Sequence, residues 1–419
     1  MIRKLLYGND VTIDDQTSLS DLDMHVTLPI SKVGEIMDDH KIIFSNNISA
    51  SDFCNILTIC DKLALHDIIN KIFTHHKISI VPYASLIIYH ALSDDALIEL
   101  YAKTGAYNLL TAYKLLHGCI HYDTSKHRYS FEHYHRIFRD ATRNGLRVIN
   151  ISARDEFIND DHIQYCTFLT TLTIHDTDCK ITTCAPFAKS LKVLSAINYS
   201  HFGDEILRSC TSIVELYAKD NHRITTCAPF ANSLEILDAS SYCGIGDDGL
   251  TSCRFIKNLI ASNNIKITTC NPFANSLKIL KASGNCGIAD ISIVSCHNIK
   301  ELYVYANRKI TTCAPFAKSL KLLSAPYNHG ICDNSISSCY SLECLIATNN
   351  PMITTCAPFA KSLKRLFASG DRCGITTKEV LLCKFLIQLY ANGNDKIDRS
   401  KIRLPSDNIS KSGCTSHAV

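Results

Sequence analysis

The chain has 419 residues, of which 46% are hydrophobic and 20% charged, with a formal net charge of +3. This balance is typical of a globular protein and argues against a strongly basic nucleic-acid binder. The opening MIRKLLYGNDVTID has no continuous apolar stretch, and no segment reaches the roughly 20 apolar residues of a spanning helix, so we expect an intracellular, cytoplasmic protein without a membrane partner.

Residues 1–145 lack the repeat that fills the rest of the chain, and they are predicted to form a mainly helical domain. Between Ser51 and Phe73, apolar side chains recur at near-helical spacing with a break at residues 65–67, which predicts two short packed helices. Further helices are expected at residues 83–90, 94–102, 107–117 and 131–144.

Within this region, CNILTICDKLALHDIINKI resembles the helical pair of BTB/POZ and Skp-type domains. Leu28-Pro29, followed by Val33, Ile36 and Met37, resembles the strand and helix that precede that pair, so the resemblance covers residues 26–74. It implies docking to a cullin, although the stretch before it is too short for a complete BTB sheet. Leu28-Pro29 is also compatible with an F-box, and a third interpretation is that the region caps the first repeat.

An octapeptide close to ITTCAPFA recurs five times, and its cysteine always stands 43 residues after the previous one. The cysteines are Cys184, Cys227, Cys270, Cys313 and Cys356. A fixed period indicates a repeat array, in which function belongs to a repeated surface rather than to a single pocket.

Each period contains two shorter units with the pattern L-x-x-L-x-A-x-x-N-x-x-I, most clearly from Leu277 and Ile256. About twelve such units, spaced 21 to 23 residues, cover residues 146–397. Pattern and spacing resemble leucine-rich-repeat proteins. The resemblance implies an α/β solenoid with a parallel sheet on the concave face, preceded by the helical domain and followed by a polar tail at residues 398–419.

Alternate residues of a strand face opposite sides of a sheet, so Leu280 and Ala282 are expected to point into the core. Asn285 follows that strand, and its amide is expected to satisfy backbone groups where the chain turns. The same position is assigned to Asn221, Asn264, Asn307, Asn328, Asn350 and Asn394. Because alanine replaces the usual leucine in several units, we expect the Pro-Phe pair of each octapeptide to fill the core from the convex side.

The chain contains 21 cysteines, a number that would indicate disulfides in a secreted protein. Members of one series stand two strands apart, about 10 Å, beyond the ~4.4–6.8 Å between the Cα atoms of a disulfide. A second series occupies another position in its units, so the two series need not meet: Cys210, Cys253, Cys296 and Cys339. We therefore predict reduced, core-forming thiols, and without a C-x-x-C pair we expect no metal and no cofactor.

Strand residues predicted to face outward are where the repeats differ from one another. Alternate units place there Thr173, Tyr217, Ile260, Tyr303, Ile346 and Tyr390, interleaved with Ser195, Asp238, Lys281, Ser324 and Phe367. Strands favour aromatic and branched residues in any case, but exposed aromatic rings also supply contact area for a protein. We predict a partner-binding stripe made of Tyr217, Ile260, Tyr303, Ile346, Phe367 and Tyr390.

Two other groups of residues are assigned less specific roles. A ladder of Lys192, Lys278, Lys321 and Lys364 is interpreted as a solvated edge rather than as a contact for phosphate or acidic protein. No phosphate-binding glycine loop, H-E-x-x-H or G-x-S-x-G is present, and only Cys119, near His117 and His121, resembles a nucleophile beside a base.

The sequence therefore predicts a non-enzymatic protein that binds a protein partner on the concave face of a solenoid. The alternative is a substrate-recognition adaptor of a cullin-type ubiquitin ligase, with a cullin or ring-ligase subunit bound by residues 1–145. A scaffold that assembles through its ends is a third reading. The nearly identical repeats and the abundance of Ile, Asn, Lys and Asp resemble repeat proteins of large amoebal viruses, which implies the host cytoplasm.

Overall fold

The computed structural model describes residues 37–38, 41–42, 119–123, 139, 147–153, 158–174, 180–198 and 201–404. The chain forms two compact units, Met1–Leu169 and Thr170–Val419. In the first, β1 (Met37–Asp38) pairs antiparallel with β2 (Lys41–Ile42), and β3 (Cys119–Asp123) pairs in parallel with β4 (Arg147–Ala153). The helix α9 (Asp160–Ile163) follows, with Asn159 as its N-cap.

Apart from Arg139, which is helical, the helices predicted at residues 51–73, 83–90, 94–102, 107–117 and 131–144 lie outside the described residues, as does most of the BTB- and Skp-like stretch. A docking or capping role for residues 1–145 therefore stays a prediction, and so do the predicted domain boundaries.

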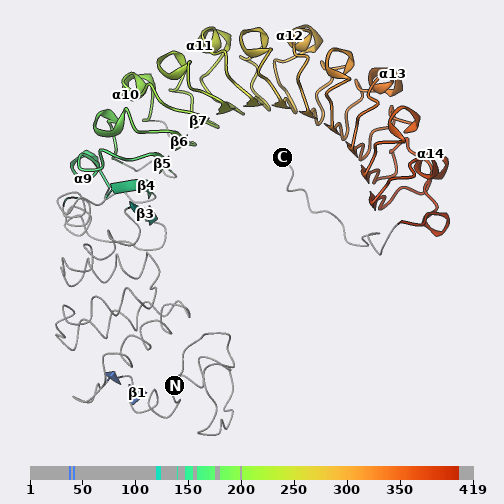
Figure 1. Ribbon diagram of the computed structural model, residues 1–419, viewed down its shortest axis with the longest axis horizontal. Helices are drawn as coiled ribbons and strands as arrows, with labels where there is room; N and C mark the ends of the chain where they lie inside the picture. The colour runs from blue at the N-terminus through green and yellow to red at the C-terminus, as the bar shows by residue number, and fades with distance from the viewer. Residues whose placement is uncertain are drawn as a thin grey trace. The chain divides into compact units, whose positions relative to one another are not determined.

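The unit Thr170–Val419 is a regular array built around eleven parallel strands. Each strand pairs with the strand of the next repeat, and their order in the sheet follows the order in the chain. They line the inner, concave side of the array (Figure 1). The strands are β5 (Thr171–Ile174), β6 (Val193–Ala196), β7 (Glu215–Tyr217), β8 (Ile236–Asp238), β9 (Asn258–Ile260), β10 (Ile279–Lys281), β11 (Glu301–Tyr303), β12 (Leu322–Ser324), β13 (Cys344–Ile346), β14 (Arg365–Phe367) and β15 (Gln388–Tyr390).

Short helices form the convex side of the array, and two kinds of helix alternate along it (Figure 1). One kind is α-helical: α10 (Asp204–Leu207), α11 (Asp247–Leu250), α12 (Asp290–Ile293), α13 (Asp333–Ile336) and α14 (Thr377–Leu382). The other is a single 3₁₀ turn: η3 (Ala185–Phe187), η4 (Ala228–Phe230), η5 (Asn271–Phe273), η6 (Ala314–Phe316) and η7 (Ala357–Phe359). This alternation explains why the sequence repeats every 43 residues rather than every 21 or 22.

The core lies between the sheet and these helices. Leu277, Leu280 and Ala282 are fully buried, and the equivalent residues of the other repeats are buried in the same way. A single repeat cannot bury this apolar edge alone, so stacking against both neighbours supplies most of the stability. The fold is the leucine-rich-repeat solenoid that the sequence predicts.

The octapeptide is a core element, as predicted. Its Ala-Pro-Phe forms the 3₁₀ turn. Proline suits the first turn of a helix, because a backbone N–H at that position would have no partner within the helix and proline has none. Its phenylalanine is at most 1% exposed in each copy: Phe187, Phe230, Phe273, Phe316 and Phe359.

Buried asparagines join neighbouring repeats after the strands. In Asn264, Nδ2 donates to the carbonyls of Ala239 (2.7 Å) and Ile245 (3.1 Å), and Oδ1 accepts from the backbone N–H of Lys266 (2.8 Å). Equivalent contacts are made by Asn221, Asn307, Asn328, Asn350 and Asn394.

The prediction for Asn285 was wrong, because this side chain is exposed and the following Cys286 takes the buried place. Cysteine replaces asparagine in the same way at Cys243 and Cys373. These repeats reach the buried position one or two residues later than the pattern assumes, and a thiol needs fewer partners there than an amide.

Each strand from β6 to β15 is followed by a residue in the left-handed region. Their φ angles are positive at Asn198, Asp220, Ser241, Asn263, Gly284, Ala306, Tyr327, Asn349, Gly370 and Gly393. At Gly284 (φ 66°) an added Cβ would clash with Oδ1 of Asn263, so a larger residue there would displace that side chain.

The C-terminal end of the described chain contains the short turn η8 (Arg399–Lys401), followed by the buried Ile402. Residues 405–419, most of the predicted tail, lie outside the described residues. In the described part of the chain, no helix has the length and apolar character needed to cross a membrane.

Candidate interaction surface

The structure places all six residues of the predicted stripe in one row on the concave face. Each is the last residue of its strand, and the strand register aligns them with one another across the sheet. The complete row reads Thr173, Ser195, Tyr217, Asp238, Ile260, Lys281, Tyr303, Ser324, Ile346, Phe367 and Tyr390. All six predicted residues are half-buried, so part of each side chain remains available to a partner.

Contacts within the face fix the orientation of its aromatic rings. Phe367 and Tyr390 stack in parallel with their centroids 4.5 Å apart, and Nζ of Lys281 lies 5.2 Å from the centroid of the Tyr303 ring. Such contacts restrict the rotamers before any partner arrives, which reduces the entropy lost on binding.

Two tyrosines of the row donate to glutamates on their own strands. Oη of Tyr217 lies 2.9 Å from Oε2 of Glu215, and Oη of Tyr303 lies 2.9 Å from Oε2 of Glu301. Burial, together with the neighbouring carboxylate, raises the pKa of Tyr217 to about 12. The pKa of Tyr303 is raised for the same two reasons. Both phenols therefore remain neutral hydrogen-bond donors at physiological pH.

A second apolar row, which sequence reasoning missed, runs beside the first. It consists of the opening residues of alternate strands, all half-buried: Val193, Ile236, Ile279 and Leu322. Because these strands alternate with those that carry Tyr217, Ile260, Tyr303 and Ile346, the apolar side chains form a zigzag across the face. The sequence contained a signal for this row, because each of these apolar residues stands two positions before Ser195, Asp238, Lys281 or Ser324 and therefore faces the same side of its strand.

Sequence reasoning also missed two exposed tyrosines just beyond the strands. Tyr305 and Tyr327 are 43% and 46% exposed, and their rings meet edge to face with centroids 5.6 Å apart. Asn349 Nδ2 donates to the Tyr327 hydroxyl at 2.8 Å. Tyr327 has a positive φ of 51°, which is unfavourable for a bulky residue and costs about 1–3 kcal/mol.

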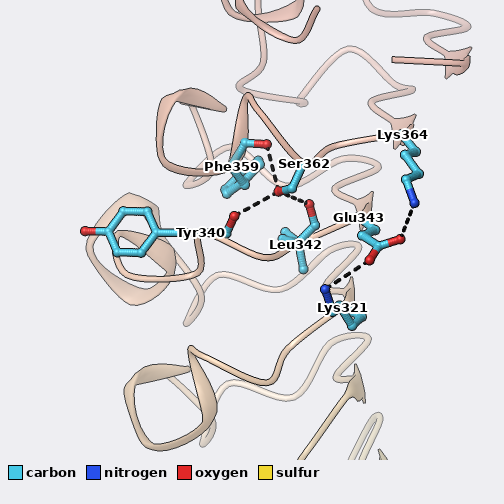
Figure 2. A network of polar contacts seen from close by, with 7 residues as sticks. All are labelled: Lys321, Tyr340, Leu342, Glu343, Phe359, Ser362 and Lys364. Carbon is cyan, nitrogen blue, oxygen red and sulfur yellow. Dashed lines mark hydrogen bonds and ion pairs between the residues drawn. The ribbon is translucent and has the colours of Figure 1, made fainter. Parts of the chain in front are cut away.

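Charged residues just before the strands differ from the predicted lysine ladder in two respects. Glu343 stands in line with these lysines and binds Lys321 (3.0 Å) and Lys364 (2.7 Å), as Figure 2 shows. Lys364 first, and then Lys321, lowers the pKa of the Glu343 carboxyl. The ladder is therefore partly neutralised, and two further lysines belong to it, Lys257 and Lys300.

The two cysteine series do meet, which corrects the expectation that they need not. Thiols of neighbouring repeats lie close enough to interact as pairs: Cys184–Cys210, Cys227–Cys253, Cys270–Cys296, Cys313–Cys339 and Cys356–Cys383. The contact with Cys253, together with burial, raises the pKa of Cys227 well above its ordinary value. From Cys166 to Cys383 the described cysteines are thiols rather than disulfides, and most of them are buried.

Two other kinds of site, a metal site and a cysteine nucleophile, were considered in the sequence. No group of three or more His, Cys, Asp or Glu side chains within the described ranges is arranged to hold a metal ion. His117 and the side chains of Cys119 and His121 lie outside what the structure describes.

No family model and no curated protein matches the chain. Similar solved structures include three internalins of Listeria monocytogenes. An internalin (inlF) is 20% identical with a TM-score of 0.43 and coverage of 57% of this chain and 78% of its own. Internalin C2 is 16% identical, with a TM-score of 0.27 and coverage of 60% and 83%. The functional domain of InlJ, which includes a cysteine ladder, is 13% identical, with a TM-score of 0.37 and coverage of 68% and 70%. The fold assignment rests on the repeat pattern and sheet described above.

Proposed function

We propose that this protein is a non-enzymatic binding module that recognises a protein partner through the concave face of its solenoid. The observation that carries the proposal is the single register row joining Tyr217, Ile260, Tyr303, Ile346, Phe367 and Tyr390. Folding alone needs only the inward side of these strands to be apolar, because the other side faces solvent.

The size and composition of the face fit a folded partner. Eight steps of about 4.8 Å between neighbouring strands separate Tyr217 from Tyr390, so the row is about 38 Å long, comparable with the ~30 Å diameter of a small domain. Tyrosine is enriched at binding hot spots, and here polar residues such as Asp238 and Lys281 separate the apolar ones. A mixture of this kind is typical of interfaces that also exist as free surfaces.

A cytoplasmic location belongs to the same proposal. Its support is that the described cysteines are thiols, the state that persists in a reducing compartment. The adaptor alternative depends on residues 1–145, and no described contact favours it.

The test compares two double variants of the full chain. Tyr303→Ser with Phe367→Ser removes two rings from the row, whereas Tyr340→Ser with Phe255→Ser removes the same residue types from exposed sites outside the concave face. Figure 2 shows Tyr340 pointing away from the strand side. Partners captured from a lysate of the source cells are identified by mass spectrometry, and their affinities are then measured with purified proteins.

The expected result is that the first pair weakens binding by at least about tenfold while the second leaves it nearly unchanged, since buried aromatic anchors dominate interface energies. Equal affinity of both variants and the unmodified chain would contradict the proposal. A severe loss of melting temperature in the first variant would show instead that these rings belong to the folding core.

A further inference from the structure

Four lysines stand in consecutive repeats along one margin of the concave face. Lys257, Lys278, Lys300 and Lys321, hereafter the lysine row, immediately precede β9, β10, β11 and β12, and all four are exposed. Backbone hydrogen bonds fix their register, because each N–H donates to the carbonyl of the preceding member at 2.8, 2.7 and 2.8 Å. Neighbouring members are therefore about one strand spacing, ~4.8 Å, apart at the backbone.

The lysine row is neutralised at its ends but not in the middle. Glu235 and Glu343 occupy the same position in the flanking repeats, and they pair with Lys257 (2.6 Å) and Lys321 (3.0 Å). Lys278 and Lys300 have no ion pair within the described residues. Like charges directly opposite one another in a sheet are destabilising, so folding does not account for this central pair.

The surroundings restrict what kind of anion fits. Glu301 follows Lys300, but its carboxylate faces the concave side and accepts from the Tyr303 hydroxyl. Glu215 and Asp238 also lie on the concave face, where they would repel a polyanion that crossed it. The described strands place these three acidic residues and two basic ones, Lys281 and Arg365, on that face, so an anionic ligand is favoured along the margin instead. This arrangement suits a short acidic stretch at the edge of a protein interface better than a nucleic acid, which would carry phosphates across the whole face.

We propose that the lysine row is the docking edge for an acidic polypeptide segment of the partner whose body occupies the concave face. This inference rests on the proposed function for the identity of the partner, but its charge chemistry can be measured separately. Lys278 and Lys300 supply the uncompensated charge, and the paired lysines on either side extend the positive edge. Lys281, which lies over the Tyr303 ring, belongs to the adjoining face and not to this margin.

The test uses a fluorescein-labelled glutamate decamer and the full chain, with affinity measured by fluorescence anisotropy. The decamer has no apolar side chain, so its binding reports on positive charge and not on the apolar stripe, and Tyr303→Ser with Phe367→Ser should leave it unchanged. Lys278→Glu with Lys300→Glu reverses the central charges. Lys266→Glu with Arg308→Glu makes the same change in net charge at exposed residues that follow β9 and β11 instead of preceding strands.

The expected result is that the unmodified chain binds the decamer at low ionic strength and loses affinity steeply as salt approaches about 0.3 M. Lys278→Glu with Lys300→Glu should weaken binding by about tenfold or more, and the matched control by less than about twofold. If the glutamate variant does not fold by circular dichroism, Lys278→Gln with Lys300→Gln replaces it, with at least about a threefold loss expected.

Three results would overturn the inference. They are no binding by the unmodified chain at low salt, an equal loss in both charge variants, and tighter binding of a thymidine decamer through the same lysines. None of them bears on the apolar stripe, so the proposed function would stand or fall on its own variants.

Discussion

Single side chains that join one repeat to the next set much of the local stability. Asn307 illustrates this, since its Nδ2 donates to the carbonyls of Ala282 (2.7 Å) and Ile288 (3.3 Å) while Oδ1 accepts from the N–H of Lys309 (2.9 Å). Asn307→Ala should lower the free energy of unfolding by about 1–3 kcal/mol, because buried backbone groups lose their partners. Asn285→Ala is the matched control, and its exposed side chain predicts almost no change in urea denaturation.

A second prediction at this scale concerns the pH at which the tyrosines of the stripe ionise. Because burial and Glu215 raise the pKa of Tyr217 to about 12, the folded state holds this proton more tightly than the unfolded state does. The stabilisation is complete below pH ~10, where unfolded tyrosine is protonated, and it is lost as the pH rises towards 12. Alkaline difference absorbance between the unmodified chain and Tyr217→Phe should show one phenol that ionises late.

Glu215→Gln provides the control for that assignment. It removes the neighbouring carboxylate but leaves the burial, so Tyr217 should ionise at a lower pH than in the unmodified chain. An unchanged titration curve would show that the hydrogen bond at 2.9 Å does not contribute.

The difference between Asn285 and Cys286 shows what the sequence could reveal at the residue scale. Counting along the repeat found six buried asparagines, because in those units the spacing from strand to turn is constant. It failed at Asn285 because the turn through Gly284 reaches the core one residue later. The backbone path of a turn depends on the neighbouring repeat, and a pattern of residue types does not contain it.

At the scale of elements, the 3₁₀ turn of the octapeptide supplies large, fully buried side chains to the core on the convex side. Phe316 is 1% exposed and lies in η6 beneath the sheet, so Phe316→Ala should cost about 3–5 kcal/mol through lost burial and the cavity left behind. Phe255, which is 49% exposed, is the matched site, and Phe255→Ala should change the free energy of unfolding by less than about 1 kcal/mol. Thermal and urea melts distinguish these outcomes, and equal losses would show that the octapeptide is not the core element described.

The contact between the two cysteine series was not predicted from the sequence. Their two series occupy different positions along the repeat, and strand spacing alone keeps the members of one series apart. Contact between Cys270 and Cys296 arises because one stands before a 3₁₀ turn and the other after an α-helix of the adjacent repeat. The two helix types bring these thiols together. The sequence pattern does not contain this contact, because it depends on how the two kinds of helix stack against each other.

For the whole molecule, the parallel sheet and the concave row could be predicted because period and alternation determine register once repeats stack. The second apolar row containing Ile236 and Ile279 was missed, because the prediction considered only the last outward-facing residue of each strand and not the first. Tyr305 and Tyr327 were missed because they follow the strands, where strand alternation no longer predicts which side chains are exposed. The partner itself is determined by a second molecule, and no property of this chain alone specifies it.

The measurement that tests the central claim most directly is site-specific photo-crosslinking in lysate of the source cells. A benzoylphenylalanine replaces Ile260 on the concave face in one protein and Ile291, the 77% exposed residue of α12, in another. The account predicts that position 260 crosslinks a defined protein that position 291 does not, and that Tyr303→Ser with Phe367→Ser abolishes the product. Crosslinks to the same proteins from both positions, or from position 291 alone, would contradict binding on the concave face.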